Sequence, residues 1–589
     1  MNEQLVFYRT RISKDLFECL LFNSDLNSHR YISSNKDDDF IDKIINIFSY
    51  KHFVFCGYNN FHHDDTVISY IIKNKLLLSY GTKQNVLSNL YSFSQTVIHK
   101  DENEWNSYKY LKLFKSIDIA CLLMPKKTRV SFKQAECNLM LNIGDIKTDV
   151  KNLEYIYNTY CKDEIEIRKE INKEYKVNVL SLDSTSAGIS ILRSLYLKKT
   201  GISWDEVKNK YTTYDTINFN KIIFDDIKFI DKQLNNLLEK LKAQTIESNK
   251  KNIKKIYFHD SYITLGLGGL HSIEKPGIIS NNNNERLLYI DINSMYPSIA
   301  VRKKIYPMHI KKEFIEIYKT LYNERIEADG TKRKVLKWIL NSAIGMFNKE
   351  GSWLYDPMAY YKISINSQMY ILMLADIIFN ANAATRIVNW NTDGLFILFN
   401  RNDDTKLLDI INKFSKKYSL PIKYEEYNSI VQYNGNNYVT YNIFNNKTTG
   451  IFNTDVEINK FANNPIISKA LKQYFIYGTD VDTTIKSCRN IFDFCTYYKK
   501  ESGWEIVYNN NIVNTNMIRY YHAVSGFGIA KQKIDLYTNR VTNTILLSKN
   551  QCIVCDDNTV FPDNVDYRYY ISKCKQIINE IENIQLNLF

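Results

Sequence analysis

Long apolar runs are absent from this sequence. No stretch approaches the ~18 consecutive apolar residues of a membrane-spanning helix, although 44% of the 589 residues are hydrophobic. Residues 1–4 lack the basic segment followed by an apolar one that marks a secretory signal. We therefore expect no membrane span and no secretion signal.

Cysteine is sparse and scattered. The chain has 10 cysteines, and only Cys552 and Cys555 form a Cys-x-x-Cys pair. Zinc sites built from cysteine need a second pair at suitable spacing, which is missing here, so a zinc site is not predicted. Reduced thiols in a cytoplasm are the expectation.

Acidic residues are the scarcer charge. The chain has 77 Lys and Arg against 64 Asp and Glu, which gives a net charge of +13. This excess of positive charge suits a polyanionic partner such as nucleic acid. Aromatic residues make up 14%, with 44 Tyr among them, and bases can stack on such side chains. The chain also uses Asn, Lys, Ile and Tyr heavily, and an AT-rich genome is part of the cause of this composition. The length predicts several domains.

A buried strand that ends in a carboxylate is the most informative stretch. Leu287 to Ile290 is an apolar run rich in β-formers, Asp291 follows it, and Pro297 and Ser298 then allow a helix to start. An Asp at a strand end is well placed to hold a metal ion rigidly. The alternative is an Asp that only caps the next element.

A basic helix follows this strand. On a helix over 333–347, Arg333, Lys337 and Asn341 are successive i,i+4 neighbours, and we expect Ile344 to continue their stripe. Two cations, an amide and an apolar side chain suit a triphosphate with a base attached. The alternative is a solvated basic face.

A second carboxylate lies in a predicted hairpin turn. Asn391-Thr392-Asp393-Gly394 stands between two apolar runs, and Asp-Gly in that setting is a strong hairpin signal. A plain tight turn is the alternative. Together with Asp291 and the basic helix, Asp393 completes the minimum set for two-metal phosphoryl transfer, which needs no covalent nucleophile.

These three stretches, in this order, resemble motifs A, B and C of family B DNA-directed DNA polymerases, and above all the short bacteriophage enzymes. Asp291-Ile-Asn-Ser-Met-Tyr-Pro-Ser is similar to Asp-x-x-Ser-Leu-Tyr-Pro-Ser, and Lys337-x-x-x-Asn341-Ser342-x-x-Gly345 to Lys-x-x-x-Asn-Ser-x-Tyr-Gly. Asn391-Thr-Asp-Gly is similar to Asp-Thr-Asp-Ser, with Asn391 in place of the first Asp.

The resemblance implies an α/β multidomain fold, with a ribonuclease-H-like exonuclease domain and a right-hand polymerase. The domains that we expect are the exonuclease-like domain 1–175, a helical connector 176–255, a palm 256–312 and 350–460, fingers 313–349, and a thumb with the C-terminal region 461–589. Within them we expect paired strands at Leu5 to Tyr8 and Phe17 to Phe22, helices from Ser186, over Lys228 to Ile256, 314–328 and 331–348, and a mostly helical segment after 461.

The resemblance also implies roles for individual residues. Asp291, Asp393 and the main-chain carbonyl of Ile292 would hold two Mg²⁺ ions, with Mn²⁺ as the alternative. The incoming dNTP would meet Tyr296 under its sugar, Arg333 and Lys337 at the triphosphate, and Asn341 and Ile344 at the nascent base pair; Lys337 would also protonate pyrophosphate. DNA would contact Gly268, Gly269, Tyr438 and Lys447.

The exonuclease motifs are degenerate. Asn60 and Asp64 resemble the ends of the second motif, while Tyr160 and Glu164 resemble the third, with Glu in place of Asp. The first motif needs Asp-x-Glu on the first strand, where this sequence has Arg9 and Arg11. Arginine stays charged and cannot ligate Mg²⁺. We therefore predict an exonuclease fold without proofreading.

The resemblance predicts primer–template DNA and dNTPs as partners, and it is compatible with accessory replication proteins. The interval from Asp291 to Lys337 is too short for the insertion of protein-primed phage polymerases, so no protein primer is expected. Localisation would be cytoplasmic, in the host cell if a phage encodes the chain. Two alternatives stay open: a catalytically silent homologue that binds DNA as a structural subunit, and a polymerase with relaxed templating.

Overall fold

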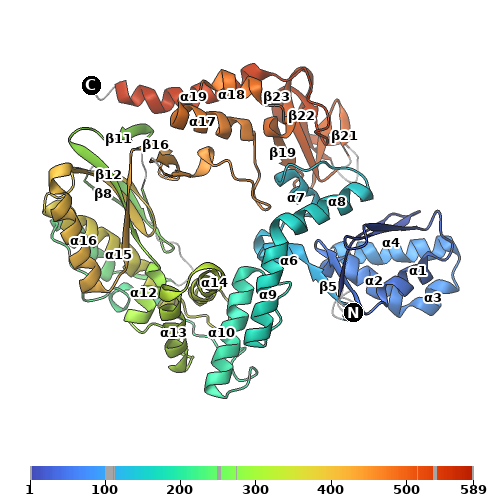
Figure 1. Cartoon of the computed structure of the whole chain (residues 1–589), viewed down its shortest axis with the longest axis horizontal. Coiled ribbons are helices and arrows are strands. Elements are labelled where there is room, and N and C mark those ends of the chain that lie inside the picture. Colours follow the sequence, from blue (N-terminus) through green and yellow to red (C-terminus); the bar gives the residue numbers. More distant parts are fainter. Residues whose placement is uncertain are drawn as a thin grey trace. The chain divides into compact units, whose positions relative to one another are not determined.

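The structure is a computed structural model that describes residues 3–99, 111, 113–247, 254–259, 261–272, 275–442, 444–513, 515–534 and 540–586. It has a mixed α/β architecture, and the chain forms two compact units (Figure 1). The first unit contains Met1–Ser186, Asp455–Pro465 and Arg489–Asp566. The second contains Ala187–Thr454, Ile466–Cys488 and Tyr567–Phe589, so neither unit is one continuous stretch of sequence.

A five-stranded sheet with the order β3-β2-β1-β4-β5 begins the first unit. β1 pairs antiparallel with β2 and parallel with β4, which confirms the predicted pairing of Leu5 to Tyr8 with Phe17 to Phe22. The side chains alternate between the two faces, as strand geometry requires. The strands are β1 Gln4–Ile12, β2 Phe17–Asn23, β3 Ser28–Ser33, β4 Phe53–Gly57 and β5 Ser116–Asp118.

Helices cover both faces of this sheet. Val6 and Tyr8 pack in a cluster with helices α1 to α4, whereas Phe7 packs in a second cluster with α6 to α9. The first group is α1 Phe40–Phe48, α2 Asp64–Lys73, α3 Lys75–Ser79 and α4 Lys83–His99. The second is α6 Ile119–Leu123, α7 Phe132–Asn138, α8 Ile146–Ile156 and α9 Lys162–Tyr175.

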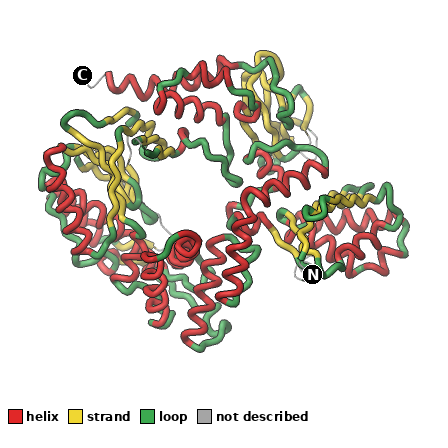
Figure 2. The backbone as a smooth tube through the Cα atoms, in the orientation of Figure 1, coloured by secondary structure: helices red, strands yellow, loops and turns green. Residues whose placement is uncertain are grey.

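The first unit also contains a second sheet, which is drawn in yellow at the upper right of Figure 2. Its strands are β19 Cys495–Lys499, β20 Trp504–Tyr508, β21 Asn511–Val513, β22 Met517–Ile534 and β23 Val541–Val554. The prediction of a mostly helical segment after 461 is therefore wrong here. The buried Ile506, Ile518, Tyr520 and Ile529 form its core, since β-branched and aromatic side chains suit a pleated surface.

Two sheets pack together in the second unit, with the strand orders β13-β14-β12-β15 and β11-β16-β17-β18. The buried cluster of Leu287, Phe396, Leu398, Ile430 and Tyr438 joins them. The first sheet has β12 Glu285–Ile292, β13 Arg386–Trp390, β14 Gly394–Asn400 and β15 Ile422–Tyr427. The second has β11 Gly277–Ser280, β16 Ser429–Asn434, β17 Asn437–Tyr441 and β18 Asn446–Thr448.

Shorter strands complete the second unit. They are β6 Thr216–Asn218 and β7 Thr245–Glu247, which pair together, and β8 Lys254–Phe258, β9 Ser261–Leu265 and β10 Leu270–Ser272. The predicted single helix from Lys228 to Ile256 is wrong: α11 spans only Lys232–Lys242, and β7 and β8 follow it. The residues between these two strands, 248–253, lie outside the described part of the chain.

The helices of the second unit include the predicted pair at 314–328 and 331–348, which the structure confirms as α13 Glu313–Glu327 and α14 Gly330–Phe347. The others are α10 Ser184–Thr200, α12 Met295–Arg302, α15 Pro357–Asn380, α16 Asp404–Tyr418, α17 Pro465–Tyr477, α18 Val481–Ser487 and α19 Tyr567–Leu586. The predicted region 461–589 is divided between the two units.

One helix in the described part of the chain, α15, is long and apolar enough to cross a membrane. Of its most apolar window, 89% is buried inside the protein. A core helix of a soluble protein has the same properties, and α15 contacts α12, α14 and α16.

Candidate functional site

The two predicted carboxylates lie on neighbouring strands of the second unit. Asp291 in β12 is directly opposite Gly394, the first residue of β14, so Asp393 in the preceding turn is its neighbour. The main-chain N–H of Ile292 donates to the carbonyl oxygen of Asp393 at 2.8 Å. A Cβ at Gly394 would collide with the carbonyl oxygen of Ile290, so glycine allows this close approach.

Three further side chains surround Asp291. The Tyr289 hydroxyl donates to Asp291 Oδ1 at 3.3 Å, and Lys447 Nζ lies 4.9 Å from the centre of the Tyr289 ring. Lys423 is the cross-strand partner of Asp291 on β15. Burial and the neighbouring Asp393 raise the pKa of Asp291, while the Tyr289 hydrogen bond, Lys447 and Lys423 act in the opposite direction. Sequence reasoning missed Tyr289 and Lys423, because only the strand register brings them to Asp291.

The glycine-rich segment is the turn between β9 and β10, and it lies at the same site. The Tyr296 hydroxyl donates to the carbonyl oxygen of Gly268 at 3.0 Å. A Cβ at Gly269 would lie 2.8 Å from Thr392 Oγ1, immediately before Asp393. Burial raises the pKa of Tyr296 to about 12, so its hydroxyl remains a donor. Gly268, Gly269 and Tyr296, for which DNA and nucleotide contacts are predicted, thus lie close together, with Gly268 exposed and Gly269 buried.

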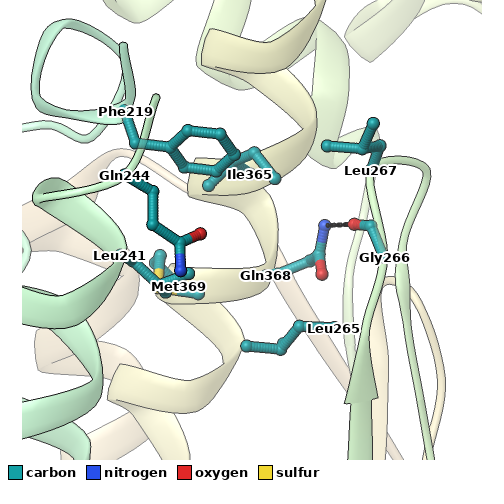
Figure 3. Close-up of a pocket in the computed structure, with 9 residues that line it drawn as sticks. All are labelled: Phe219, Leu241, Gln244, Leu265, Gly266, Leu267, Ile365, Gln368 and Met369. Carbon is teal, nitrogen blue, oxygen red and sulfur yellow. Dashed lines mark hydrogen bonds between the residues drawn. The ribbon is translucent and has the colours of Figure 1, made fainter. Parts of the chain in front are cut away.

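A side chain of α15 supports this turn from behind. Figure 3 shows Gln368 Nε2 donating to the carbonyl oxygen of Gly266, at 2.8 Å, in a small, mostly apolar pocket. Gln368 is 1% exposed, and its second hydrogen bond, to the carbonyl oxygen of Ser364, is 2.9 Å long. The turn is therefore tied to the core of the second unit.

The exposed face of α14 differs from the predicted stripe. Lys337 and Asn341 are exposed as expected, but Ile344 is only 2% exposed and packs into the core. The expected exposed stripe is therefore wrong at Ile344, which offers little surface for the predicted contact with a nascent base pair. Position i+4 from Asn341 is Gly345, which is exposed and has open space where a Cβ would lie.

Arg333 has a structural contact that the sequence did not reveal. Its Nη1 donates to the carbonyl oxygens of Arg325 and Ala328, at 3.1 Å and 3.2 Å, and so caps the end of α13. Arg325 in turn donates from Nη1 to Ser294 Oγ at 2.8 Å, three residues after Asp291. Part of the Arg333 guanidinium is thus used to join α13 and α14.

Tyr438 lies close to the site but in the core. It is 3% exposed, and its hydroxyl accepts a hydrogen bond from Asn391 Nδ2 at 3.3 Å. Its ring therefore offers little surface to DNA. Lys447, on the neighbouring strand β18, is exposed and is one of the two cations of this region, with Lys423 as the other.

The predicted nuclease motifs come together in the first unit around ion pairs. Arg9 Nη1 lies 3.2 Å from Asp64 Oδ2, and Thr10 also donates to Asp64. Asp64 is 2% exposed, and burial alone would raise its pKa, but Arg9, His63 and Thr10 lower it to about 2. Asn60 Nδ2 donates to the adjacent Asp65 at 2.9 Å.

The second arginine is paired as well. Arg11 Nη2 lies 2.8 Å from Asp149 Oδ2 on α8, a carboxylate that the sequence did not single out. Glu136 on α7 is near both pairs, and burial raises its pKa to about 7. Asn152 Nδ2 donates to Glu136 Oε1 at 2.7 Å.

The predicted third nuclease motif lies at the junction of α8 and α9. Glu164 Oε2 accepts from Arg168 Nη1 at 2.6 Å, and Arg168 is 1% exposed. Tyr160 belongs to a π-helical segment, Tyr157–Cys161, and packs against the core cluster on the α6 to α9 face. It is Asp149, rather than Glu164, that the structure pairs with β1.

The donor set at Asp291 and Asp393 fits Mg²⁺, which prefers hard oxygen ligands. Asp393 is exposed, Asp291 is partly buried, and the carbonyl of Ile292 follows directly. Among the described residues, no group of three or more His, Cys, Asp or Glu side chains could hold a metal ion. Two carboxylates with further ligands from substrate phosphates and water are the usual protein contribution to a Mg²⁺ site.

No protein-family model matches the chain, and no curated protein matches it either.

Proposed function

We propose that this protein is a template-directed DNA polymerase of family B type, which extends a primer 3′-hydroxyl with dNTPs. In this proposal the sheet that carries Asp291 and Asp393 is the palm, and α13 and α14 are the fingers. The segments after 461 that belong to the second unit are part of the thumb. The first sheet of the first unit, with its helices, is a ribonuclease-H-like exonuclease domain.

One observation carries the proposal: two carboxylates from different parts of the sequence lie on adjacent strand ends, with the glycine turn and Tyr296 beside them. Two bound Mg²⁺ or Mn²⁺ ions would supply the charge that activates the primer hydroxyl and stabilises the leaving pyrophosphate. Asp291, Asp393 and the carbonyl of Ile292 would hold these ions. Two carboxylates without the glycine turn and Tyr296 beside them would have supported only a structural role.

The chain's own residues have defined tasks in this reaction. Lys337 would bind the triphosphate through its ammonium charge, and Arg333 would bind it through the N–H groups that do not cap α13. Lys337 would also donate a proton to the leaving pyrophosphate. Asn341 and the open surface at Gly345 would contact the nascent base pair. Tyr296 would orient the sugar, with its hydroxyl fixed on Gly268.

We further propose that the first unit does not proofread. Its predicted nuclease centre contains Arg9 paired with Asp64 and Arg11 paired with Asp149. These guanidinium groups stand where a nuclease needs carboxylates, and they repel divalent cations.

Primer extension tests the proposed activity. A 5′-labelled primer on a longer template, with Mg²⁺ and dNTPs, should be extended to the template end, and without dNTPs it should not shorten. Asp291→Asn should remove extension, by a factor of at least about 10², while DNA affinity in a filter-binding assay stays near that of the unsubstituted chain. Shortening without dNTPs would contradict the loss of proofreading, and no extension in Mg²⁺ or Mn²⁺ would contradict the polymerase.

A second candidate is a catalytically silent homologue that binds DNA as a structural replication subunit. Asn391 favours it, because this residue stands in place of the first Asp of the resembled motif and its amide donates to Tyr438. A protein of this kind has no catalytic activity, so this candidate predicts that Asp291→Asn leaves DNA binding unchanged and that neither protein extends a primer.

A further inference from the structure

The two site carboxylates already have two cations beside them. Lys447 reaches over the Tyr289 ring from β18, with 4.9 Å between Nζ and the ring centre, and Tyr289 donates to Asp291. Lys423 stands opposite Asp291 on β15. These two ammonium groups therefore offset part of the carboxylate charge before any metal binds, although burial and the neighbouring Asp393 still raise the pKa of Asp291.

The other polar groups of this region are engaged elsewhere. Glu425, opposite Tyr289 on β15, accepts from the Tyr427 hydroxyl at 2.8 Å and from Asn442 Nδ2 at 3.2 Å. Asn391 donates to Tyr438. Lys447 is thus an exposed cation that lies over the Tyr289 ring, whose hydroxyl donates to Asp291.

Lys447 is held weakly enough to move. A cation–π contact at an exposed site is worth about 0.5–1 kcal/mol, and the long lysine side chain has many rotamers. A phosphate group of a nucleic acid backbone would compete for this ammonium group more strongly than the ring does. Its removal would leave Asp291 and Asp393 less compensated, which favours a divalent cation.

We propose that Lys447 is an internal counter-ion of the Asp291–Asp393 pair, which weakens divalent-cation binding in the free protein and is released by the phosphate backbone of bound DNA. The inference rests on the proposed function, because it takes these two carboxylates as the metal-binding groups. Linkage then requires that DNA and metal strengthen each other's binding by the same factor.

Binding of Mn²⁺ to the full chain, measured by electron paramagnetic resonance without dNTPs, tests this coupling. Lys447→Met should bind Mn²⁺ at least about fivefold more tightly than the unsubstituted chain, which corresponds to the lower end of typical coupling energies. A primer–template duplex should tighten Mn²⁺ binding of the unsubstituted chain but add little to Lys447→Met. The Asp291→Asn variant mixed with the same duplex serves as the background control, because the Mn²⁺ bound in that sample is bound to the DNA itself.

Lys413→Met is the matched control, because it removes the same charge from α16, where Lys413 is 76% exposed and pairs with Asp409 at 2.6 Å. If Lys447→Met and Lys413→Met bind Mn²⁺ with equal affinity while Asp291→Asn does not bind it, the counter-ion role of Lys447 is refuted and the metal site stands. Mn²⁺ binding that is unchanged in Asp291→Asn would overturn the metal site, and with it the proposed function and this inference. Thermal unfolding shows whether each variant is folded.

Discussion

The buried carboxyl group of Glu136 contributes to the pH dependence of the stability of the first unit. It is 2% exposed, and burial raises its pKa from 4.5 to about 7. Between these pH values the folded chain keeps a proton that the unfolded chain releases. The free energy of unfolding therefore falls as the pH rises from 4.5 to 7, and the penalty is fully present above that window.

Glu136→Gln should remove the contribution of this group, because the amide still accepts from Asn152 and carries no charge; Asp65, whose pKa burial raises to about 6, contributes equally in both proteins. We expect the variant to exceed the unsubstituted chain in free energy of unfolding by up to about 3 kcal/mol at pH 8, and to match it at pH 4. Urea unfolding followed across this pH range measures the difference. A constant difference at all pH values would show that the effect comes from packing and not from the proton.

Substituting two lysines one turn apart on α14 distinguishes a role in triphosphate binding from a structural role. Lys337 is exposed on the face proposed for the triphosphate, whereas Lys334 lies over the Trp338 ring with 5.7 Å between Nζ and the ring centre. Lys337→Met should raise KM for dNTPs and lower kcat, together by about 10²-fold or more, as for other phosphate clamps. Lys334→Met, which removes the same charge, should leave both constants within about twofold. Similar losses in the two variants would place the triphosphate elsewhere.

Among the elements, those with strong local signals could be predicted from the sequence. The apolar run before Asp291, the Asp-Gly turn at 393–394 and the helical pair on either side of Gly330 all lie where their patterns indicate. The helix expected from Lys228 to Ile256 fails because Thr245–Glu247 pairs with β6, a partner that no local pattern reveals. The sheet after Cys495 was missed for the same reason.

The site was predictable to a similar extent. Motif residues such as Asp291 and Asp393 could be named, because their chemistry is visible in sequence. Ile344 was misplaced, because a helix of 3.6 residues per turn brings Gly345, not Ile344, into line with Lys337 and Asn341. Lys423 and Tyr289 depend on strand register, and the role of Asp149 depends on how α8 packs on β1.

Two helical glycines give opposite predictions at the scale of elements. A Cβ at Gly188 on α10 would lie 2.8 Å from the carbonyl oxygen of Trp338, so α10 and α14 cross closely there. Gly188→Ala should destabilise the chain by about 1–3 kcal/mol. Gly345→Ala, on α14 with open space around the new methyl group, should stabilise it by up to about 1 kcal/mol. Chemical denaturation of both variants provides the comparison, and equal effects would mean that helix propensity alone decides.

At the scale of the whole molecule, Arg519 connects distant parts of the sequence within the first unit. It is 1% exposed and donates to the carbonyl oxygens of Leu141, Cys555 and Asp556 at 2.7–2.9 Å. Arg519→Met would leave these buried acceptors without that partner, at a cost of about 3 kcal/mol or more. Hydrogen exchange should then become faster in the strands of the first unit and stay unchanged in α14 and α15. Gly188→Ala should show the reverse pattern, and faster exchange throughout the chain in either variant would contradict separate units.

The division of the first unit into three segments has a consequence for how the protein is made. The Arg519–Leu141 hydrogen bond joins residues 378 positions apart, so during translation the first 186 residues leave the ribosome long before their partners exist. The second unit waits as well, because its segment with α19 is synthesised after the third segment of the first unit. Neither unit can therefore finish folding before its last segment has been synthesised, and buried surfaces such as the one under Arg519 stay uncovered until then.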